Sequence, residues 1–175
     1  MINIALVAHD GRKKELLEWV EYNALKLTNY NLYATGTTGR LISQKFKDIA
    51  NKMLDHCEYS PMDEREEKEV KLLFEASKNI KCLLSGSLGG DAQVASMIAG
   101  GKIDALIFFC DNLIVQGHNS DIQGLTRLAS LYNVAFAPNR TTADLVLTSP
   151  LFDDKKYTPI KPNFDKFLNR KIEIS

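Results

Sequence analysis

Apolar and polar positions follow two different periods along this chain. Short apolar runs at residues 2–8, 31–34, 80–84, 104–109 and 134–137 predict five strands, and the first is apolar throughout except for Asn3. Such near-continuous apolar character is typical of strands that are covered on both faces of a sheet. The strands are separated by segments with a helical period, at about residues 12–27, after 39, at 62–77, up to 98, at 120–132 and at 141–147.

Strands that alternate with helices imply parallel strands joined by right-handed crossovers. The predicted fold class is therefore α/β: a doubly wound three-layer sandwich around a mainly parallel five-stranded sheet. A length of 175 residues fits one compact domain, and we expect a single domain over residues 1–175. Ligands of such sheets bind beyond the carboxyl ends of the strands, so chemically active residues should follow directly after strands.

Residues 44–78 depart from this alternation because they are highly charged. Ser60–Asp63 is typical of a helix start, with Pro61 at the first helical position. A helix over residues 62–77 would then be exposed, although it carries apolar residues such as Leu73. We interpret this segment as an inserted helical hairpin on the surface, away from the active centre, and not as a second domain.

Composition and charge narrow the classes of function. Lys plus Arg and Asp plus Glu both number 22, so net charge favours neither nucleic acid nor a membrane surface as a partner. The start of the chain lacks the basic region of a signal peptide, and the apolar stretch 105–110 is far too short to span a bilayer. Three cysteines, two of them in predicted buried strands, indicate reduced structural thiols, so we expect a cytoplasmic protein.

Polar and ionisable residues follow each predicted strand where its carboxyl end is expected. Because these ends meet at one edge of a parallel sheet, we expect their side chains to lie close together. In chain order they are His9, Asp10, Arg12 and Lys13; the turn TGTTG at residues 35–39; the turn SGSLGGD at residues 85–91; Asp111, His118 and Asp121; and Asn139 and Arg140.

The TGTTG turn predicts a phosphate site. Its backbone N–H groups, its hydroxyls and the start of the following helix provide donors suited to a phosphate dianion. Lys13 would add a positive point charge to the same phosphate site. The alternative is an ordinary capped turn, in which Thr and Gly are common.

The SGSLGGD turn allows close approach of backbone to a ligand, and it delivers the Asp91 carboxylate at the start of a helix. The alternative is that Asp91 only interacts with the helix dipole. Asp121 has a stronger alternative of this kind, because Ser120 and Asp121 together look like a helix cap. His9 and His118 stand beside carboxylates at strand ends, which favours a chemical role for both.

The sequence contains no nucleophile elbow, Walker A loop, dinucleotide fingerprint or metal-ligand spacing. We therefore expect no metal. Phosphate donors, carboxylates and imidazoles together suit the abstraction of a proton next to a carbonyl group on a small phosphorylated substrate.

Several motifs together closely resemble methylglyoxal synthases. They are VAHD at residues 7–10 with Lys13, YATGTTGRLI at 33–42, LSGSLGGDAQV at 84–94, GKIDALIFF at 101–109, the stretch 111–121, and TTADLVLTSPLF at 141–152. They occur in the order of that family and cover nearly the whole chain outside the insertion. Where the family often has prolines, the loops 110–113 and 117–121 keep their ionisable groups and lack the prolines.

The resemblance implies a lyase that converts dihydroxyacetone phosphate to methylglyoxal and inorganic phosphate, without cofactor or metal, usually as a homohexamer. It implies that Asp91 takes the proton from the substrate and that His9 and His118 lie at the reacting centre. The implied substrate contacts are His9, Lys13, Thr35, Gly36, Thr37, Thr38, Ser85, Gly86 and His118. The implied accessory residues are Asp10, Asp121 and Arg170, the last of which would reach the site of a neighbouring subunit.

A second class of function stays open at this point. The same architecture serves as the regulatory effector domain of carbamoyl phosphate synthetases, in which a similar phosphate pocket binds nucleotides without catalysis. Such domains are not expected to keep His9, Asp91 and His118 together. The presence of all three favours the enzyme.

Overall fold

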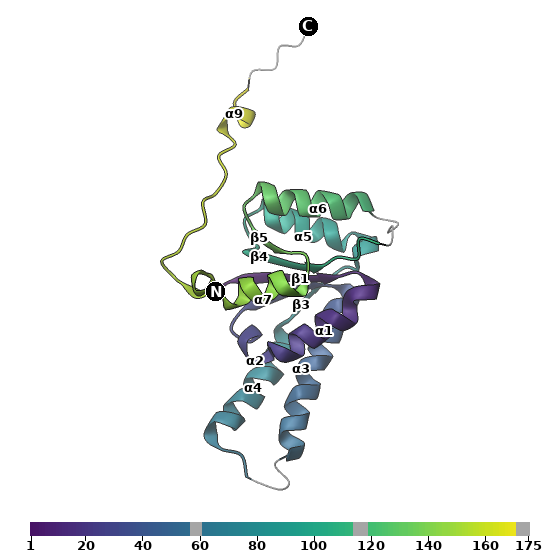
Figure 1. Cartoon of the computed structure of the whole chain (residues 1–175), viewed down its shortest axis with the longest axis vertical. Coiled ribbons are helices and arrows are strands. Elements are labelled where there is room, and N and C mark those ends of the chain that lie inside the picture. Colours follow the sequence, from purple (N-terminus) through teal and green to yellow (C-terminus); the bar gives the residue numbers. More distant parts are fainter. Residues whose placement is uncertain (57–60, 114–118, 171–175) are drawn as a thin grey trace.

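One parallel sheet lies at the centre of the molecule. The computed structural model describes residues 1–56, 61–113 and 119–170, and these form a five-stranded sheet in the order β3-β2-β1-β4-β5 (Figure 1). All four pairings are parallel, so the predicted fold is confirmed with a sheet that is parallel throughout. The strands are β1 (Asn3–Ala8), β2 (Asn31–Thr35), β3 (Lys81–Leu83), β4 (Ala105–Phe109) and β5 (Ala135–Ala137).

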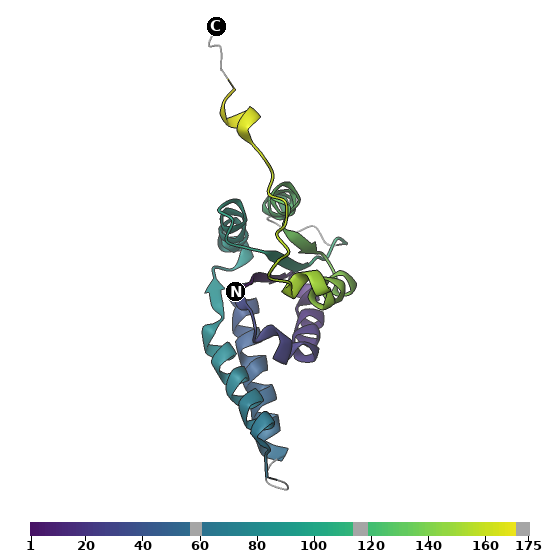
Figure 2. The same cartoon turned by 90° about the vertical axis from the view of Figure 1, so that its left-hand side faces the viewer.

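Helices cover both faces of the sheet and complete the three layers (Figure 2). One face carries α1 (Lys13–Tyr22), α3 (Gly36–His56), α4 (Glu64–Asn79) and α7 (Arg140–Thr148), and the other carries α5 (Gly90–Ala99) and α6 (Asn119–Leu131). Neighbouring residues of a strand face opposite layers, so Phe109 packs in the first core and Phe108 in the second. Every residue of β4 is buried, as expected for a strand covered on both faces.

The prediction of one helix over residues 12–27 is wrong, because the structure divides it at Asn23. A 3₁₀ turn, Asp10–Arg12, precedes α1, and a short α2 (Ala24–Leu27) follows it. The Asn23 side-chain amide donates to the Trp19 carbonyl at 3.0 Å, the same carbonyl that accepts the Asn23 N–H at 3.1 Å. The side chain therefore competes with the backbone for a helical acceptor, which weakens the helix there.

Within the predicted insertion, residues 44–56 form the far part of α3 and residues 64–78 form most of α4, and the two helices pack side by side (Figures 1 and 2). The start of α4 differs from the prediction, since the cap is Asp63 and Pro61 lies before the helix. The Asp63 carboxylate accepts the Glu66 N–H at 2.8 Å, and the Glu66 carboxylate accepts the Asp63 N–H at 3.0 Å. This reciprocal capping box fixes the start of the helix.

The expectation that α4 is an exposed helix is wrong for its second half. Its first turns are exposed, whereas Val70 and Leu73 are buried in the same core as Phe46 of α3. The Ser43 hydroxyl also donates to the Ser77 carbonyl at 2.6 Å. The pair of helices is therefore part of the core near the sheet and leaves it only at its outer end.

The cysteines also differ from the expectation of buried strand residues. Cys82 lies in the edge strand β3, no residue of which is fully buried, and is itself exposed. Cys110 directly follows β4 and is half-buried, and burial raises the pKa of its thiol to about 11. Cys57 lies outside the described residues.

After α7 the chain leaves the sheet. The Tyr30 hydroxyl donates to the Asp153 carboxylate at 2.6 Å and so holds α8 (Pro150–Asp153) against the body. An extended segment then leads to α9 (Asp165–Leu168), which lies away from the sheet in Figure 1. Within the described ranges, no helix combines the length and the apolar character that crossing a membrane requires.

Candidate active site

The segments that follow β1, β2, β3 and β4 begin side by side along the carboxyl edge of the sheet. In the ladder, Ala8 pairs with Phe109 and Thr35 pairs with Leu83. The chain runs from β1 to β2 on one side, whereas β4 lies on the other side of β1. In open α/β sheets a crevice forms at this point of reversal and is the usual site for ligands.

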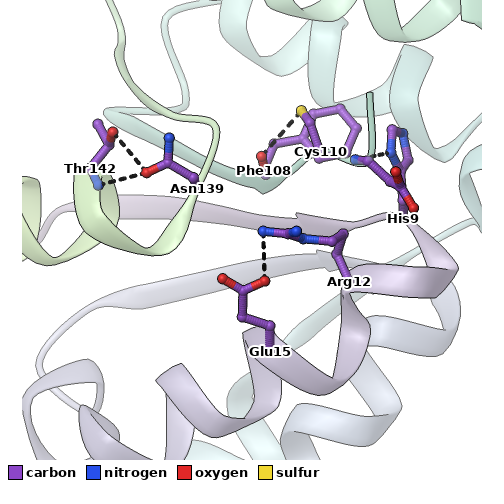
Figure 3. Close-up of polar contacts among 8 residues, drawn as sticks. His9, Arg12, Glu15, Phe108, Cys110, Asn139 and Thr142 are labelled. Carbon is purple, nitrogen blue, oxygen red and sulfur yellow. Dashed lines mark hydrogen bonds and ion pairs between the residues drawn. The ribbon is translucent and has the colours of Figure 1, made fainter. Parts of the chain in front are cut away.

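His9 is buried at this crevice, and its ring is held by the neighbouring strand end. The Asp111 N–H donates to His9 Nδ1 at 2.7 Å (Figure 3), and the ring packs edge-on against Phe108 with the centroids 4.9 Å apart. Because Nδ1 accepts a backbone N–H, the neutral imidazole carries its proton on Nε2. His9 therefore offers a single, fixed N–H donor.

Asp111 belongs to this site, although no role is predicted for it from sequence. Its backbone orients the imidazole, and its carboxylate lies against Gly11, where an added Cβ would come within 3.0 Å of Oδ2. Its position two residues beyond the end of β4 is the one signal in the sequence, because a backbone N–H is present at almost every residue.

Lys13 and Asp10 form an ion pair on the turn that follows His9. Lys13 Nζ lies 2.5 Å from Asp10 Oδ1, and the Lys13 side chain is 22% exposed whereas that of Asp10 is 93% exposed. The structure thus pairs Lys13 with Asp10 on the turn that directly follows the buried His9. Arg12 pairs with Glu15 at 2.6 Å, as Figure 3 shows.

The TGTTG turn is the N-terminus of α3. Thr35 ends β2 and the helix begins at Gly36, so the first N–H groups of a 21-residue helix lie at the carboxyl edge. These are the groups that an α-helix leaves without acceptors inside the helix, and they carry its positive dipole end. Thr35 and Thr38 are buried there and Thr37 is exposed, so Thr37 is the threonine of this turn that a ligand from solvent can reach.

The SGSLGGD turn places Asp91 in the first turn of α5, where the side chain is only 2% exposed. The Ser85 carbonyl accepts the N–H groups of Leu88 and Gly90, both at 2.9 Å. Gly89 has a φ of 97°, a left-handed conformation that glycine adopts without strain. The turn therefore delivers a buried carboxylate to a second helix N-terminus, whose dipole stabilises negative charge.

Close backbone packing joins the two turns. A Cβ added to Gly36 would lie 2.9 Å from the Ser85 nitrogen, and one added to Gly90 would lie 2.0 Å from the Leu84 oxygen. The Gly36 N–H also donates to the Leu84 carbonyl at 3.0 Å. The predicted phosphate cradle and the predicted base are thus built on one shared piece of backbone.

Known proteins are similar to this chain over almost its whole length. Residues 15–137 match the MGS-like domain family. A methylglyoxal synthase of Hahella chejuensis is 38% identical over 170 residues, which are 97% of this chain and 90% of that protein. The chain belongs to the methylglyoxal synthase family. A second relative, the methylglyoxal synthase of Maridesulfovibrio salexigens, is 39% identical over 171 residues, 97% of each chain.

The three-dimensional comparison agrees. A solved methylglyoxal synthase from Elizabethkingia anophelis is 36% identical and superimposes with a TM-score of 0.76, covering 100% of this chain and 95% of that one. The resemblance to methylglyoxal synthases that the motifs indicated is thereby confirmed, and so is the prediction of a lyase of this family.

Two of the predicted accessory residues are exposed, and one predicted catalytic residue lies outside the described part of the chain. Asp121 is exposed in the first turn of α6. Arg170 is exposed beyond α9, and the role predicted for it concerns the site of a neighbouring subunit. His118 lies outside the described residues. Within residues 1–56, 61–113 and 119–170, no group of three or more His, Cys, Asp or Glu side chains could hold a metal ion.

Proposed function

We propose that this protein converts dihydroxyacetone phosphate to methylglyoxal and inorganic phosphate. The observation that carries the proposal is the contact between the two turns, since the turn that leads to Asp91 packs against Gly36 of the cradle. A base and a phosphate anchor fixed relative to one another are what this reaction requires. The names of the similar proteins point to the same product.

The phosphate group is bound at the start of α3. Its donors are the backbone N–H groups of Thr37 and Thr38 and the hydroxyls of the turn 35–38, in which Gly36 lets the two turns approach closely. Lys13 supplies the cation, and Ser85 and Gly86 contact the substrate from the adjoining turn. The positive dipole end of α3 adds to their effect. Inorganic phosphate fits the same donors, so it is both a product and a competitor of the substrate.

Asp91 is the general base. Its carboxylate takes a proton from the carbon that bears the substrate hydroxyl, and the electron pair left behind forms an enediolate with the neighbouring carbonyl. The Nε2–H of His9 and the imidazole of His118 stabilise the negative oxygen. Asp10 and Asp121 are accessory acids. Asp10 acts by pairing with Lys13.

Phosphate then leaves by elimination. The bridging C–O bond breaks, its electron pair departs with the phosphate, and the enol that results becomes methylglyoxal after release. This step requires the C–O bond to stand roughly perpendicular to the enediolate plane, whereas an isomerase holds that bond in the plane. The cradle sets this angle, and the reaction needs no cofactor and no metal.

The setting of the enzyme follows from the resemblance. We propose a cytoplasmic homohexamer in which Arg170 of one subunit reaches the site of another. The chain acts as one domain over residues 1–175, and the outer end of the helical pair at 44–78 takes no part in the chemistry. Since α3 starts at the cradle and has 21 residues, its far end lies about 30 Å away.

The test is direct. Purified protein is incubated with dihydroxyacetone phosphate, and free phosphate and methylglyoxal are measured together. Equal amounts of the two products support the proposal, and a Glu67→Gln variant, changed at an exposed position of α4, serves as a control that should keep full activity. Absence of turnover combined with nucleotide binding would assign the chain to the regulatory effector class instead.

A further inference from the structure

Gln93 connects α5 to the end of β3. Its side-chain Oε1 accepts the Leu84 N–H at 2.9 Å, so the side chain reaches back across the whole turn 85–90. Leu84 directly follows β3, which ends at Leu83. Only the oxygen of the amide can face an N–H, which fixes how the side chain is oriented.

The same residue, Leu84, is held on its other side by the phosphate cradle. Its carbonyl accepts the Gly36 N–H at 3.0 Å, and Gly90 packs so closely against that oxygen that a Cβ would come within 2.0 Å. Leu84 is therefore tied through its N–H to the helix of Asp91 and through its carbonyl to the helix of the cradle.

We propose that Gln93 is a positioning residue that fixes Asp91 relative to the phosphate cradle and so sets how much of the enediolate eliminates phosphate. The inference rests on the proposed function. Gln93 lies two residues beyond Asp91 in the same helix, so its hydrogen bond restrains the first turn of α5 against sliding and rotation. Gln93 is itself exposed, so burial of a polar group does not explain its bond to the backbone.

The enediolate either eliminates phosphate or returns to substrate, and the chemistry makes the ratio of these two outcomes sensitive to the restraint. Asp91 determines the plane of the enediolate by the direction in which the proton leaves, and the cradle determines where the phosphate stands. When the two are aligned, the C–O bond breaks and its electron pair leaves with the phosphate. When they are not, the carbon takes back a proton that has exchanged with solvent, no C–O bond breaks, and substrate is recovered.

The experiment compares Gln93→Leu with Gln93→Glu in deuterium oxide. Leu removes the acceptor, and Glu keeps an acceptor oxygen at the same reach. Gln123→Leu, on the exposed surface of α6, is the matched control. For each protein, kcat, KM, inhibition by phosphate, and deuterium in the unreacted substrate per methylglyoxal formed are measured.

We expect Gln93→Leu to lower kcat about tenfold or more, with KM and phosphate inhibition changed by less than about threefold. The ratio of deuterium uptake to product should rise about tenfold, and Gln93→Glu should restore it to near the wild-type value. A role in stability alone would leave that ratio unchanged. Gln93→Asn, whose amide is one methylene too short, gives the same test if the Leu variant does not fold.

The outcomes separate two ideas. An unchanged deuterium ratio in all three Gln93 variants, or a raised ratio that Glu fails to restore, removes Gln93 from a positioning role while wild-type turnover still supports the enzyme. Lack of methylglyoxal from the wild-type protein removes the proposed function itself.

Discussion

The two ends of α3 differ in how narrowly packing restricts the residues that can occupy them. At the first end, a Cβ on Gly36 would lie 2.9 Å from the backbone nitrogen of Ser85, so no side chain fits without moving the site. Toward the other end, the helix carries exposed polar pairs such as Gln44 with Asp48, 2.8 Å apart. At the first end, close backbone packing determines which residue is possible. Toward the other end, only the alternation of buried and exposed positions is required, and many residues satisfy it.

This comparison separates chemistry from stability. Changes at the carboxyl edge of the sheet should alter turnover or phosphate binding, and changes at the outer end of the helical pair should alter only the free energy of unfolding. Four substitutions test the separation, taken here from the largest expected effect to the smallest.

The largest effect is expected for Asp91→Asn. Asn keeps the size of the side chain but has no basic oxygen at neutral pH, so kcat should fall by about two to four orders of magnitude with substrate affinity nearly kept. If Asp91 served only the helix dipole, the variant would lose about 1 kcal/mol of stability and turn over normally. Measuring kcat, substrate affinity and Tm on the same preparation distinguishes the two.

Gly90→Ala should be next. The new Cβ would overlap the Leu84 oxygen, so the shared backbone must shift, at a cost of roughly 1–3 kcal/mol in stability and with loss of turnover. Gly124→Ala is the matched control, because Gly124 lies in α6 with nothing within 4 Å of an added Cβ. There Ala should stabilise by up to about 1 kcal/mol, as urea unfolding would measure. Equal effects at both positions would contradict the role given to the close packing.

Thr37→Ala should act on binding. Loss of one hydroxyl that faces a phosphate dianion should raise KM and the inhibition constant for phosphate together, by about tenfold. Thr37→Ser retains the hydroxyl and should behave as wild type. A change in turnover with unaltered phosphate affinity would show that the cradle lies elsewhere.

The smallest effect is expected at the outer end of the helical pair. Asp63→Ala removes the cap of α4 and should cost about 1 kcal/mol of unfolding free energy, while Asp63→Asn should keep most of it. Kinetic constants should not change in either variant. Any change in KM would show that the two ends of α3 are coupled.

Much of this organisation could be predicted from sequence because it depends on local pattern. The short apolar runs predict the strands, and the segments that follow these runs predict His9, the TGTTG turn and Asp91 as candidate site residues. The break at Asn23 could not be predicted, since it depends on a side chain that bonds to the preceding turn. The pairing of His9 with Asp111 joins residues 102 positions apart through a backbone N–H, which the pattern of side chains does not encode.

The shared backbone at Leu84 also constrains how the sequence can change over evolution. Gly36 and Gly90 both pack against Leu84 or its neighbour, and the Leu84 carbonyl faces both glycines. A side chain at one glycine displaces the surface that the other one contacts, so their substitutions should be strongly non-additive. A substitution at only one of the two glycines is therefore selected against, and evolution can replace them only by changing both turns together.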